Sequence, residues 1–357
     1  MTNILPFLKS LLSIPGLSGY EDPAARLIQA EWQSLVDELS LSRLGSVHGF
    51  KRGAGEDPRP SVMLAAHMDA IGLMVAQIED GFLRITSIGE VDSRILPGQA
   101  VIVHATGTGT NEDLPGVIVM PPARLLPPGN GDSVVDISHL FVDVGLLPSK
   151  VASLVRIGDL VSFGTEAVEM SREIVSGHSI DNCASVAVLT LCLQELQSKS
   201  HAWDVWVVAT VQEEIEYAGA TTSAFQLRPD LAIAVDVTFA KGPGTNGWET
   251  FELGKGPTLG HGPNIHPYLF KQFKELAERL EIPYATEIMP ESSGTDGMAM
   301  QITAEGIPNF VLSIPIRYMH TPVEMVALKD IQRAGRLLAE FIAGLELDFM
   351  STITWDD

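Results

Sequence analysis

Carboxylate and imidazole side chains in this sequence repeatedly follow runs of apolar residues. The adjacent glutamates Glu213 and Glu214 come just after the largely β-branched run Val205–Val211. A short run of this kind is typical of a strand that is buried on both faces. Buried carboxylates are destabilising unless a cation pairs with them, and open α/β sheets carry their chemistry beyond the carboxyl ends of their strands. The pattern predicts a site with a cation beside the two glutamates; two exposed loop glutamates are the alternative for the pair taken alone.

A second pair of polar residues, His67 and Asp69, follows the apolar run Ser61–Ala66. Side chains alternate along an extended chain, so these two residues are expected to share one side. A carboxylate beside an imidazole is the usual device that orients a metal-bound histidine. A histidine and an aspartate that only cap a strand end are the alternative at this position.

Further candidates lie at comparable positions along the chain. Asp181 stands where an apolar helix is predicted to begin, and helix N-capping is the alternative role for an aspartate there. Asp236 lies near the end of the buried strand predicted over residues 231–237. His320 comes shortly after the strand predicted over residues 309–315. Because such strands present one common edge, these side chains are expected to join the same site.

Together the candidates offer two imidazoles and several carboxylates. This set of nitrogen and oxygen ligands suits Zn, Co or Mn better than Ca. The carboxylates suffice for two metals with one shared bridge, which leaves a glutamate free for proton transfer. Neither H-E-x-x-H nor G-x-S-x-G occurs, so one-helix zinc proteases and nucleophile-elbow hydrolases lack support. The predicted site residues are His67, Asp69, Asp181, Glu213, Glu214, Asp236 and His320.

The segments that carry these residues alternate between buried strands and helical patterns, which is typical of an α/β domain. The intervening region has short apolar runs separated by turn-rich segments, with one helical pattern near Pro148–Leu154. We therefore predict a discontinuous α/β domain over residues 1–73 and 166–357, with an all-β domain inserted over residues 74–165. Within this insertion, residues 121–132 are predicted to form an exposed loop.

The N-terminal region is predicted to form two helices within residues 3–40. It lacks a basic start and a small-residue cleavage site, so it is interpreted as an amphipathic helix rather than a signal peptide. Ser18 and Glu21, three residues apart, have the pattern of a capping box for the second helix.

Composition narrows the classes of function. A chain of 357 residues is long enough for two domains. A net charge of −22 argues against a nucleic-acid partner, and the absence of an apolar stretch of about 20 residues argues against a membrane span. Cys183 and Cys192 lie nine residues apart on one predicted helix, where they cannot easily bridge. Reduced cysteines favour a cytoplasmic location.

The order of these motifs resembles that of the di-metal aminopeptidases of the MH clan. Within that clan, the chain is similar to the tetrahedral (TET), glutamyl and deblocking aminopeptidase family, some members of which carry an older endoglucanase label. The resemblance covers essentially the whole chain, and the ordered set is more specific than any one motif. The motifs are H-x-D at 67–69, Asp-Asn at 181–182, Q-E-E at 212–214, V-D-V at 235–237 and R-Y-x-H-[ST]-P at 317–322.

The resemblance implies a fold, a cofactor and a substrate class. The fold would be a mixed-sheet, three-layer α/β/α catalytic domain with a small inserted β-barrel that serves as an apical or dimerisation domain. The cofactor would be two divalent metal ions per subunit, either zinc or cobalt. The substrates would be peptides with a free N-terminus, and the protein would form a homo-oligomer between a dimer and a tetrahedral dodecamer.

The resemblance also implies roles for the site residues. One metal would be held by His67, Asp181 and Asp236, and the other by Asp181, Glu214 and His320. Glu213 would be the general base, which takes a proton from a metal-bridging water and passes it to the leaving amine. Asp69 would orient His67. A cis peptide bond would join Asp181 to Asn182.

The sequence departs from the family pattern at several positions. Cys183 replaces an arginine that commonly follows Asp-Asn, and both the stretch Ile215–Gly219 and the stretch Ser293–Asp296 differ from the usual residues. These departures bear on the substrate pocket and on assembly. The alternatives are a related di-metal amidohydrolase (a carboxypeptidase or N-acyl deacylase) and a metal-binding assembly subunit without activity. Glycosidase activity is disfavoured, because it would need two facing carboxylates that bind no metal.

Overall fold

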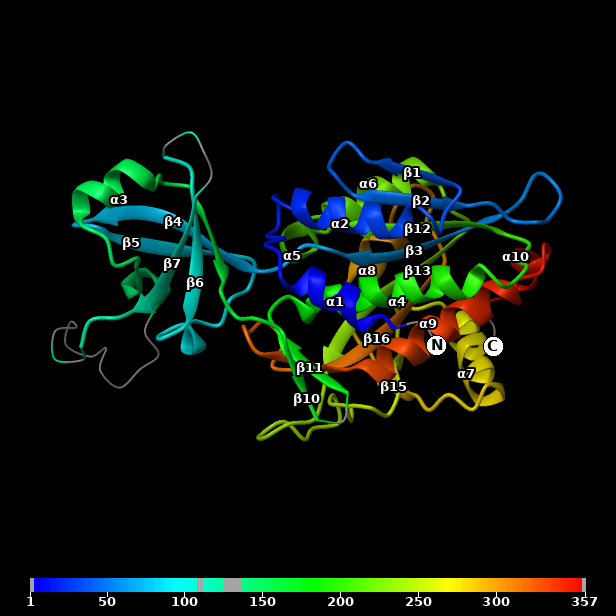
Figure 1. Ribbon diagram of the computed structural model, residues 1–357. Coiled ribbons are helices and arrows are strands. Elements are labelled where there is room, and N and C mark those ends of the chain that lie inside the picture. Colours follow the sequence, from blue (N-terminus) through cyan, green and yellow to red (C-terminus); the bar gives the residue numbers. More distant parts are fainter. Residues whose placement is uncertain are drawn as a thin grey trace.

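The computed structural model describes residues 3–354, except residues 108, 110–111, 123, 125–135 and 172. Its larger sheet has 11 strands (Figure 1). The main path of this sheet runs, in spatial order, through β1 (Glu38–Leu41), β2 (Val47–Lys51), β12 (Asp204–Thr210), β3 (Ser61–His67), β13 (Leu231–Phe239), β16 (Asn309–Arg317), β17 (Glu324–Ala327), β11 (Ile174–Gly177) and β10 (Val168–Met170). Off this path, β14 (Thr258–His261) pairs with β16 and with β15 (Ala285–Ile288).

The centre of this sheet is parallel and largely buried. Strand β3 lies between β12 and β13 and pairs with both in parallel, and β13 pairs in parallel with β16. The register places Thr210, near the end of β12, opposite His67, the last residue of β3. The strand predicted from the run at 205–211 is therefore confirmed as an interior strand of a mixed sheet. Because the parallel strands end at one edge, the residues that follow them meet there.

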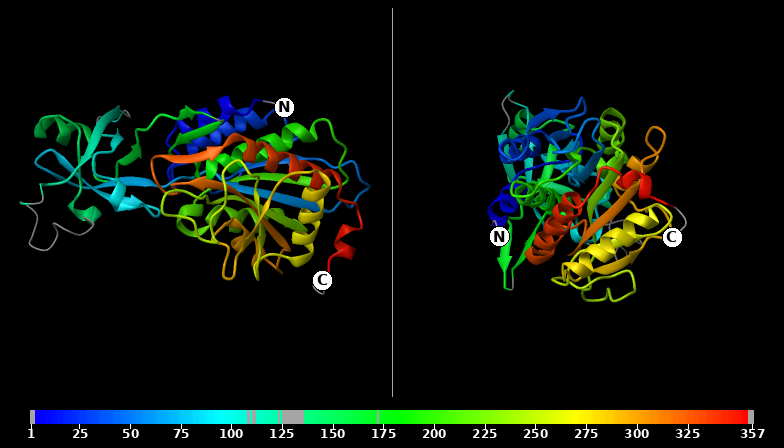
Figure 2. Two further views of the ribbon diagram at one scale, coloured as in Figure 1. Left: turned by 90° about the horizontal axis from the view of Figure 1, so that it is seen from below. Right: turned by 90° about the vertical axis from the view of Figure 1, so that its right-hand side faces the viewer.

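Helices cover both faces of the sheet (Figure 2). Helix α4 (Ile180–Leu196) packs on β3 and β13 and contacts α1 (Leu5–Leu12) and α9 (Leu328–Ala343), while α6 (Ala218–Leu227) and α8 (Asp296–Gln301) pack together against β3. A Cβ added to Gly335 of α9 would lie 2.7 Å from the Leu191 Cβ, so glycine there permits the close approach of α9 and α4. The remaining α-helices are α2 (Asp22–Trp32), α3 (Pro148–Leu154), α5 (Glu213–Glu216), α7 (Pro267–Arg279) and α10 (Phe349–Thr352).

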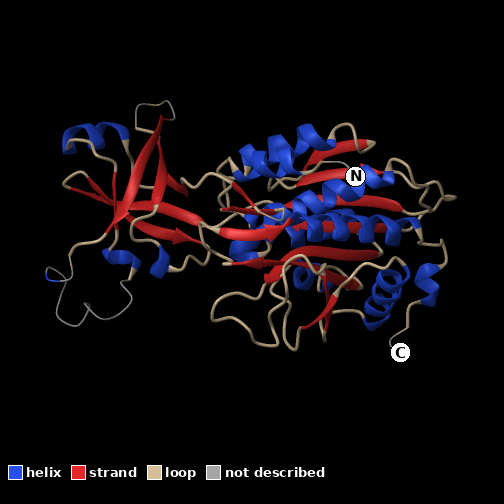
Figure 3. Cartoon of the chain, turned by 60° about the horizontal axis from the view of Figure 1, so that its bottom comes forward, coloured by secondary structure: helices blue, strands red, loops and turns tan. Residues whose placement is uncertain are grey.

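A second sheet closes into a barrel beside the α/β unit (Figures 1 and 3). Its inward-facing residues, such as Leu73, Val103 and Val161, form a hydrophobic core of their own. The described connections between its strands include the short 3₁₀ helices η1 (Ser93–Ile95) and η3 (Ile137–His139). The barrel strands are, in spatial order, β4 (Gly72–Glu79), β5 (Phe82–Ile88), β8 (Phe141–Asp143), β7 (Glu112–Val119), β6 (Ala100–Ala105) and β9 (Leu160–Phe163).

The predicted fold class is confirmed: a mixed-sheet α/β/α unit carries a separate closed antiparallel barrel. The helical pattern near 148–154 is α3. Most of the loop predicted over 121–132 lies outside the described residues. Cys183 and Cys192 are buried and free, as predicted. None of the helices in the described part of the chain combines the length and the apolar character needed to cross a membrane.

The predicted capping box at Ser18 and Glu21 is wrong. Helix α2 begins at Asp22, and its first turn receives no side-chain cap from Glu21. The Ser18 hydroxyl instead donates to Asp69 Oδ2 at 2.7 Å, and Glu21 Oε1 accepts from the backbone N–H groups of Gly19 and Gln212. The local spacing fits a cap, but tertiary contacts beside the sheet edge take both side chains away from the helix.

Candidate metal centre

The carboxyl edge of the sheet gathers most of the predicted residues around one cavity. This cavity has a volume of about 430 Å³. His67 ends β3, Asp236 lies on β13, and Glu213 and Glu214 open α5 directly after β12. The six predicted metal-ligand and base residues that line it are His67, Asp181, Glu213, Glu214, Asp236 and His320.

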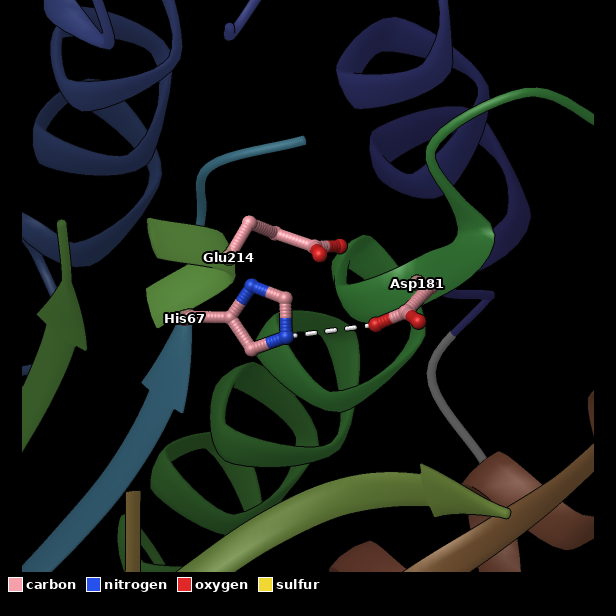
Figure 4. Close-up of side chains that lie close together, drawn as sticks. All are labelled: His67, Asp181 and Glu214. Carbon is pink, nitrogen blue, oxygen red and sulfur yellow. Dashed lines mark ion pairs between the residues drawn. The ribbon is translucent and has the colours of Figure 1, made fainter. Parts of the chain in front are cut away.

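Asp181 lies between the two imidazoles. Its Oδ1 is 3.2 Å from His67 Nε2, and its Oδ2 is 3.4 Å from His320 Nε2. Figure 4 shows the first of these contacts, with the Glu214 carboxylate above the imidazole ring. The His67 side chain is 2% exposed and that of His320 is 29% exposed. One oxygen of a single carboxylate therefore faces each histidine, which is the arrangement of a bridging ligand.

The remaining carboxylates complete two clusters around this bridge. Asp236 Oδ1 and Glu213 Oε2 lie 3.7 and 3.8 Å from His67 Nε2, and Glu214 Oε2 lies 3.5 Å from His320 Nε2. Potential ligand atoms lie within 4.8 Å of one another in the groups His67–Asp181–Glu214 and His67–Glu213–Asp236.

These distances fit a metal. Two ligands that are each about 2.1 Å from a tetrahedral ion stand about 3.4 Å apart. The donor set of imidazole nitrogens and carboxylate oxygens matches the preference of Zn and of neighbouring transition metals. The residues present therefore fit divalent cations at this edge of the sheet.

The electrostatics of the cluster lead to the same conclusion. Burial raises the pKa of Glu213 to about 10 and that of Glu214 to about 8, and neighbouring carboxylates, Asp236 and Asp181 respectively, add to each shift. Burial opposes protonation of His320, but Asp181 and Glu214 raise its pKa to about 9. So many carboxylates in one buried site retain protons unless other positive charge replaces them. A divalent cation supplies that charge and releases the protons.

Asp69 lies behind the cavity, where its side chain is completely buried. Its carboxylate accepts hydrogen bonds from the backbone N–H groups of Glu213 (2.9 Å) and Glu214 (3.1 Å) and from the Ser18 hydroxyl. The Nδ1 atom of His67 is 3.1 Å from the backbone carbonyl of Asp69 and 3.7 Å from its carboxylate. The carboxylate thus holds the turn that carries both glutamates, and the carbonyl is the nearer partner of the imidazole.

Glu324 is a site residue that sequence reasoning missed. It is 2% exposed, and its two carboxylate oxygens accept the backbone N–H groups of Asp181 (3.1 Å) and His320 (2.9 Å). It therefore fixes the backbone of the bridging aspartate and of the outer histidine together. The available signal was a carboxylate four residues after His320, at the start of a strand whose other side chains are all apolar.

Asp296 is a second residue whose position the sequence did not reveal. Its Oδ2 accepts from the Thr210 hydroxyl at 2.5 Å, and its Oδ1 has no hydrogen-bond partner among the described residues. Burial raises its pKa to about 7, and its charge contributes to the raised pKa of Glu213. A buried carboxylate with one unpartnered oxygen so near the site adds to the need for a cation.

Unusual backbone conformations surround the candidate ligands. Gln212, Ser179 and His320 have left-handed φ angles of 58°, 58° and 60°, although none of them is glycine. Such residues persist only where surrounding contacts determine them, and they concentrate at functional sites. The peptide bond between Asp181 and Asn182 is cis, as the resemblance implied.

Comparison with known proteins gives consistent results across the chain. A family model described as M42 glutamyl aminopeptidase matches residues 45–337. A lysyl aminopeptidase from Pyrococcus furiosus is 36% identical, covering 96% of this chain and 98% of the relative. The crystal structure of a TET aminopeptidase from a marine sediment archaeon, Thaumarchaeota archaeon SCGC AB-539-E09, superposes with a TM-score of 0.91 at 28% identity, covering 98% of this chain and 99% of that one. The TET1 peptidase of Pyrococcus horikoshii, described as assembling into a tetrahedron or a large octahedral shell, has a TM-score of 0.81 at 27% identity, covering 96% of this chain and 100% of that one.

Proposed function

The chain belongs to the M42 glutamyl aminopeptidase family, and from that premise we propose that it is a metal-dependent enzyme that removes residues from the N-terminus of peptides. Membership makes it a peptidase, an enzyme that hydrolyses peptide bonds. The observation that carries the metal dependence is the bridging position of Asp181, with one carboxylate oxygen 3.2 Å from His67 Nε2 and the other 3.4 Å from His320 Nε2.

The proposed ligands form two sets that share Asp181. His67 and Asp236 complete one set, and Glu214 and His320 complete the other. Zinc or cobalt suits both sets, because imidazole and carboxylate are ligands that these ions accept. Metal ions held by these residues would supply Lewis-acid chemistry, which would lower the pKa of a bound water and polarise the scissile carbonyl.

Glu213 is the proposed general base. It opens α5, and its backbone N–H donates to Asp69, so the side chain starts from a fixed position at the cavity wall. Its carboxylate is 9% exposed and lines the cavity. In this role it accepts a proton from the attacking water and delivers it to the amine of the leaving peptide.

The cavity favours a substrate amine over a substrate carboxylate. Its described lining includes Glu90, Glu213, Glu214 and Glu287 but contains neither lysine nor arginine. A carboxypeptidase needs a cationic side chain to bind the C-terminal carboxylate of its substrate, and the described lining offers no side-chain cation besides the histidines that are proposed to hold metal. The lining therefore supports recognition of a free α-amine.

The test is an assay of the purified protein with aminoacyl p-nitroanilides and their N-acetylated forms. Metal-free protein should be inactive, and addition of zinc or cobalt should restore cleavage of the free-amine substrates only. Equal release of p-nitroaniline from the acetylated substrates would point to an endopeptidase, whereas release of acetate from them would point to a deacylase. Full activity after complete metal removal would contradict the metal dependence.

We also propose that the chain divides into a catalytic domain over residues 1–73 and 166–357 and an inserted barrel domain over residues 74–165, and that it assembles into a homo-oligomer. The separate hydrophobic core of the barrel supports this division. The tetrahedron and the large octahedral shell described for the Pyrococcus horikoshii TET1 peptidase support a homo-oligomer, for which we propose a size between a dimer and a tetrahedral dodecamer. Sedimentation analysis at several protein concentrations measures the particle mass, and a monomer throughout would contradict the assembly.

The names of relatives do not agree on a preferred N-terminal residue. The family description refers to glutamyl substrates, whereas the relative from Pyrococcus furiosus is called lysyl. These two side chains carry opposite charges. The preference of this chain therefore has to be derived from its own cavity.

A further inference from the structure

We propose that Glu287 binds the side-chain cation of a basic N-terminal residue, lysine or arginine, so that the enzyme prefers such peptides and rejects those with an acidic N-terminus. This specificity rests on the proposed aminopeptidase function. It assigns a binding role to a residue outside both ligand sets and outside the general base.

Glu287 lies on β15, and its carboxylate is fixed on the wall of the cavity. Its Oε1 accepts from the Thr238 hydroxyl at 2.5 Å, and its Oε2 accepts from the Thr258 hydroxyl at 2.6 Å. Thr238 is two residues after Asp236 on β13, so both side chains point to the same face of the sheet. These hydrogen bonds therefore place Glu287 beside the proposed metal centre, although it belongs to neither set of proposed ligands.

The carboxylate of Glu287 has no cationic partner among the ion pairs of the described residues. Burial raises its pKa, while the two threonine hydroxyls lower it. Glu287 is half-buried. A carboxylate that is partly removed from water and has no counter-ion is destabilising, and a ligand ammonium or guanidinium would compensate for it. The described lining of the cavity contains neither lysine nor arginine, so the charged side chains around Glu287, apart from the two proposed metal-ligating histidines, are carboxylates that disfavour an acidic side chain.

The rest of the cavity suits the stem of such a side chain. Tyr217, Phe239 and Met319 line it together with Glu287. Two residues along a strand span about 7 Å, so the step from Asp236 to Thr238 is comparable to the length of an extended lysine side chain. Apolar contacts along the stem and a carboxylate at its end match the two parts of lysine and arginine.

The experiment compares lysine with its uncharged isostere. The zinc-loaded protein is assayed with the p-nitroanilides of lysine, norleucine and glutamate, and the ratio of kcat/KM for lysine to norleucine is measured. The wild type should favour lysine and should turn over glutamate least. In Glu287→Gln, the ratio should fall about 10- to 100-fold, which corresponds to one lost charge-assisted hydrogen bond. Glu287→Asp keeps the charge and should restore part of the preference.

Two controls separate a specific contact from general acidity and from misfolding. Glu90→Gln removes an exposed carboxylate from the same cavity, and it should leave the ratio close to that of the wild type. Thermal unfolding checks that each variant is folded. If Glu287→Gln leaves the ratio unchanged, the proposal is overturned, and an equal loss of activity on lysine and norleucine would then assign Glu287 to the α-amine. A fall in the ratio that is as large in Glu90→Gln would also overturn it.

A binding measurement keeps this proposal distinct from the proposed function. Calorimetry with free L-lysine and free L-norleucine needs no turnover, and the wild type should bind lysine more tightly by a factor that Glu287→Gln removes. If no p-nitroanilide is cleaved, the aminopeptidase function fails, and the calorimetric ratio still decides the role of Glu287. Equal binding of the two amino acids by the wild type would overturn that role.

Discussion

The two sides of the proposed metal centre share Asp181 but differ in their surroundings. The inner half, formed by His67, Asp236 and Glu213, lies at the ends of sheet strands, and its histidine side chain is 2% exposed. The outer half is formed by His320, whose side chain is 29% exposed, and by Glu214, whose side chain is 5% exposed. The difference indicates that the sheet itself builds the inner half, whereas the loop after β16 has to be held in place to build the outer half.

Different buried carboxylates hold the two sides. Asp69 accepts the backbone N–H groups of Glu213 and Glu214, and so fixes the turn between β12 and α5. Glu324 accepts those of Asp181 and His320, and so fixes the bridge and the outer loop. Each oxygen of these two carboxylates accepts a hydrogen bond from a backbone N–H group. An asparagine or glutamine in the same place would direct its NH₂ group toward one of these N–H donors, and that hydrogen bond would be lost.

Substitution of the proposed base should produce the largest effect. Glu213→Gln removes the proton acceptor while keeping the size of the side chain, so kcat should fall by about 10²- to 10⁴-fold. The metal content should stay at the wild-type level, because the proposed ligands remain. Steady-state kinetics and elemental analysis measure the two quantities. Loss of metal together with activity would make Glu213 an inner-half ligand instead.

Substitution of the two supporting carboxylates separates the halves. Glu324→Gln should weaken metal binding about 10- to 100-fold, because the backbone of Asp181 and His320 loses its common acceptor. Asp69→Asn should lower kcat more than metal affinity, because it displaces the turn that carries Glu213. Calorimetric metal titration and kinetics on both variants test this pattern. Identical profiles would show that the two halves respond as one unit.

Metal affinity in the outer half should increase with pH. Without a cation, Glu214 has a pKa near 8 and His320 one near 9, so both retain protons at neutral pH that a metal must displace. Apparent affinity should therefore rise about tenfold per pH unit for each proton released, up to about those pKa values, and then level off. Calorimetry in buffers of different ionisation enthalpy counts the protons. Glu214→Gln should release fewer of them, and an affinity independent of pH would contradict the assignment.

Chelation should remove the two ions in order. Because the histidine of the outer half is 29% exposed and that of the inner half is 2% exposed, the outer ion should leave several-fold faster. The two losses should appear as separate phases of metal content over time. His320→Ala should show only the slow phase, whereas His67→Ala should lack it. Simultaneous loss of both ions would break the distinction between the halves.

Local patterns in the sequence contained much of the site. The run at 205–211 followed by two glutamates, and the run at 61–66 followed by H-x-D, each indicate a buried strand with polar residues at its end. The parallel pairing of β12 and β3 brings those ends together. This much is predictable because a buried strand leaves polar residues no place except its end or a site.

For other parts of the site, the local sequence does not indicate which residue is the partner. Glu324 acts on Asp181, which is 143 positions away, and Asp296 acts through Thr210, which is 86 positions away. The left-handed φ angles of Gln212, Ser179 and His320 are imposed on residues that do not favour them. Ser18 shows the opposite case, in which a local signal is misleading. Its spacing to Glu21 fits a capping box, but its hydroxyl donates a hydrogen bond to Asp69.

The sequence by itself determined which strands are buried, which residues end them, and which family the ordered motifs resemble. Only the tertiary structure decided which oxygen of Asp181 faces which histidine, which carboxylates hold the ligands, and that Glu287 lines the same cavity. The physical reason is range: periodicity and strand ends follow from neighbours in the chain, whereas coordination and charge pairing depend on groups that folding brings within about 4 Å.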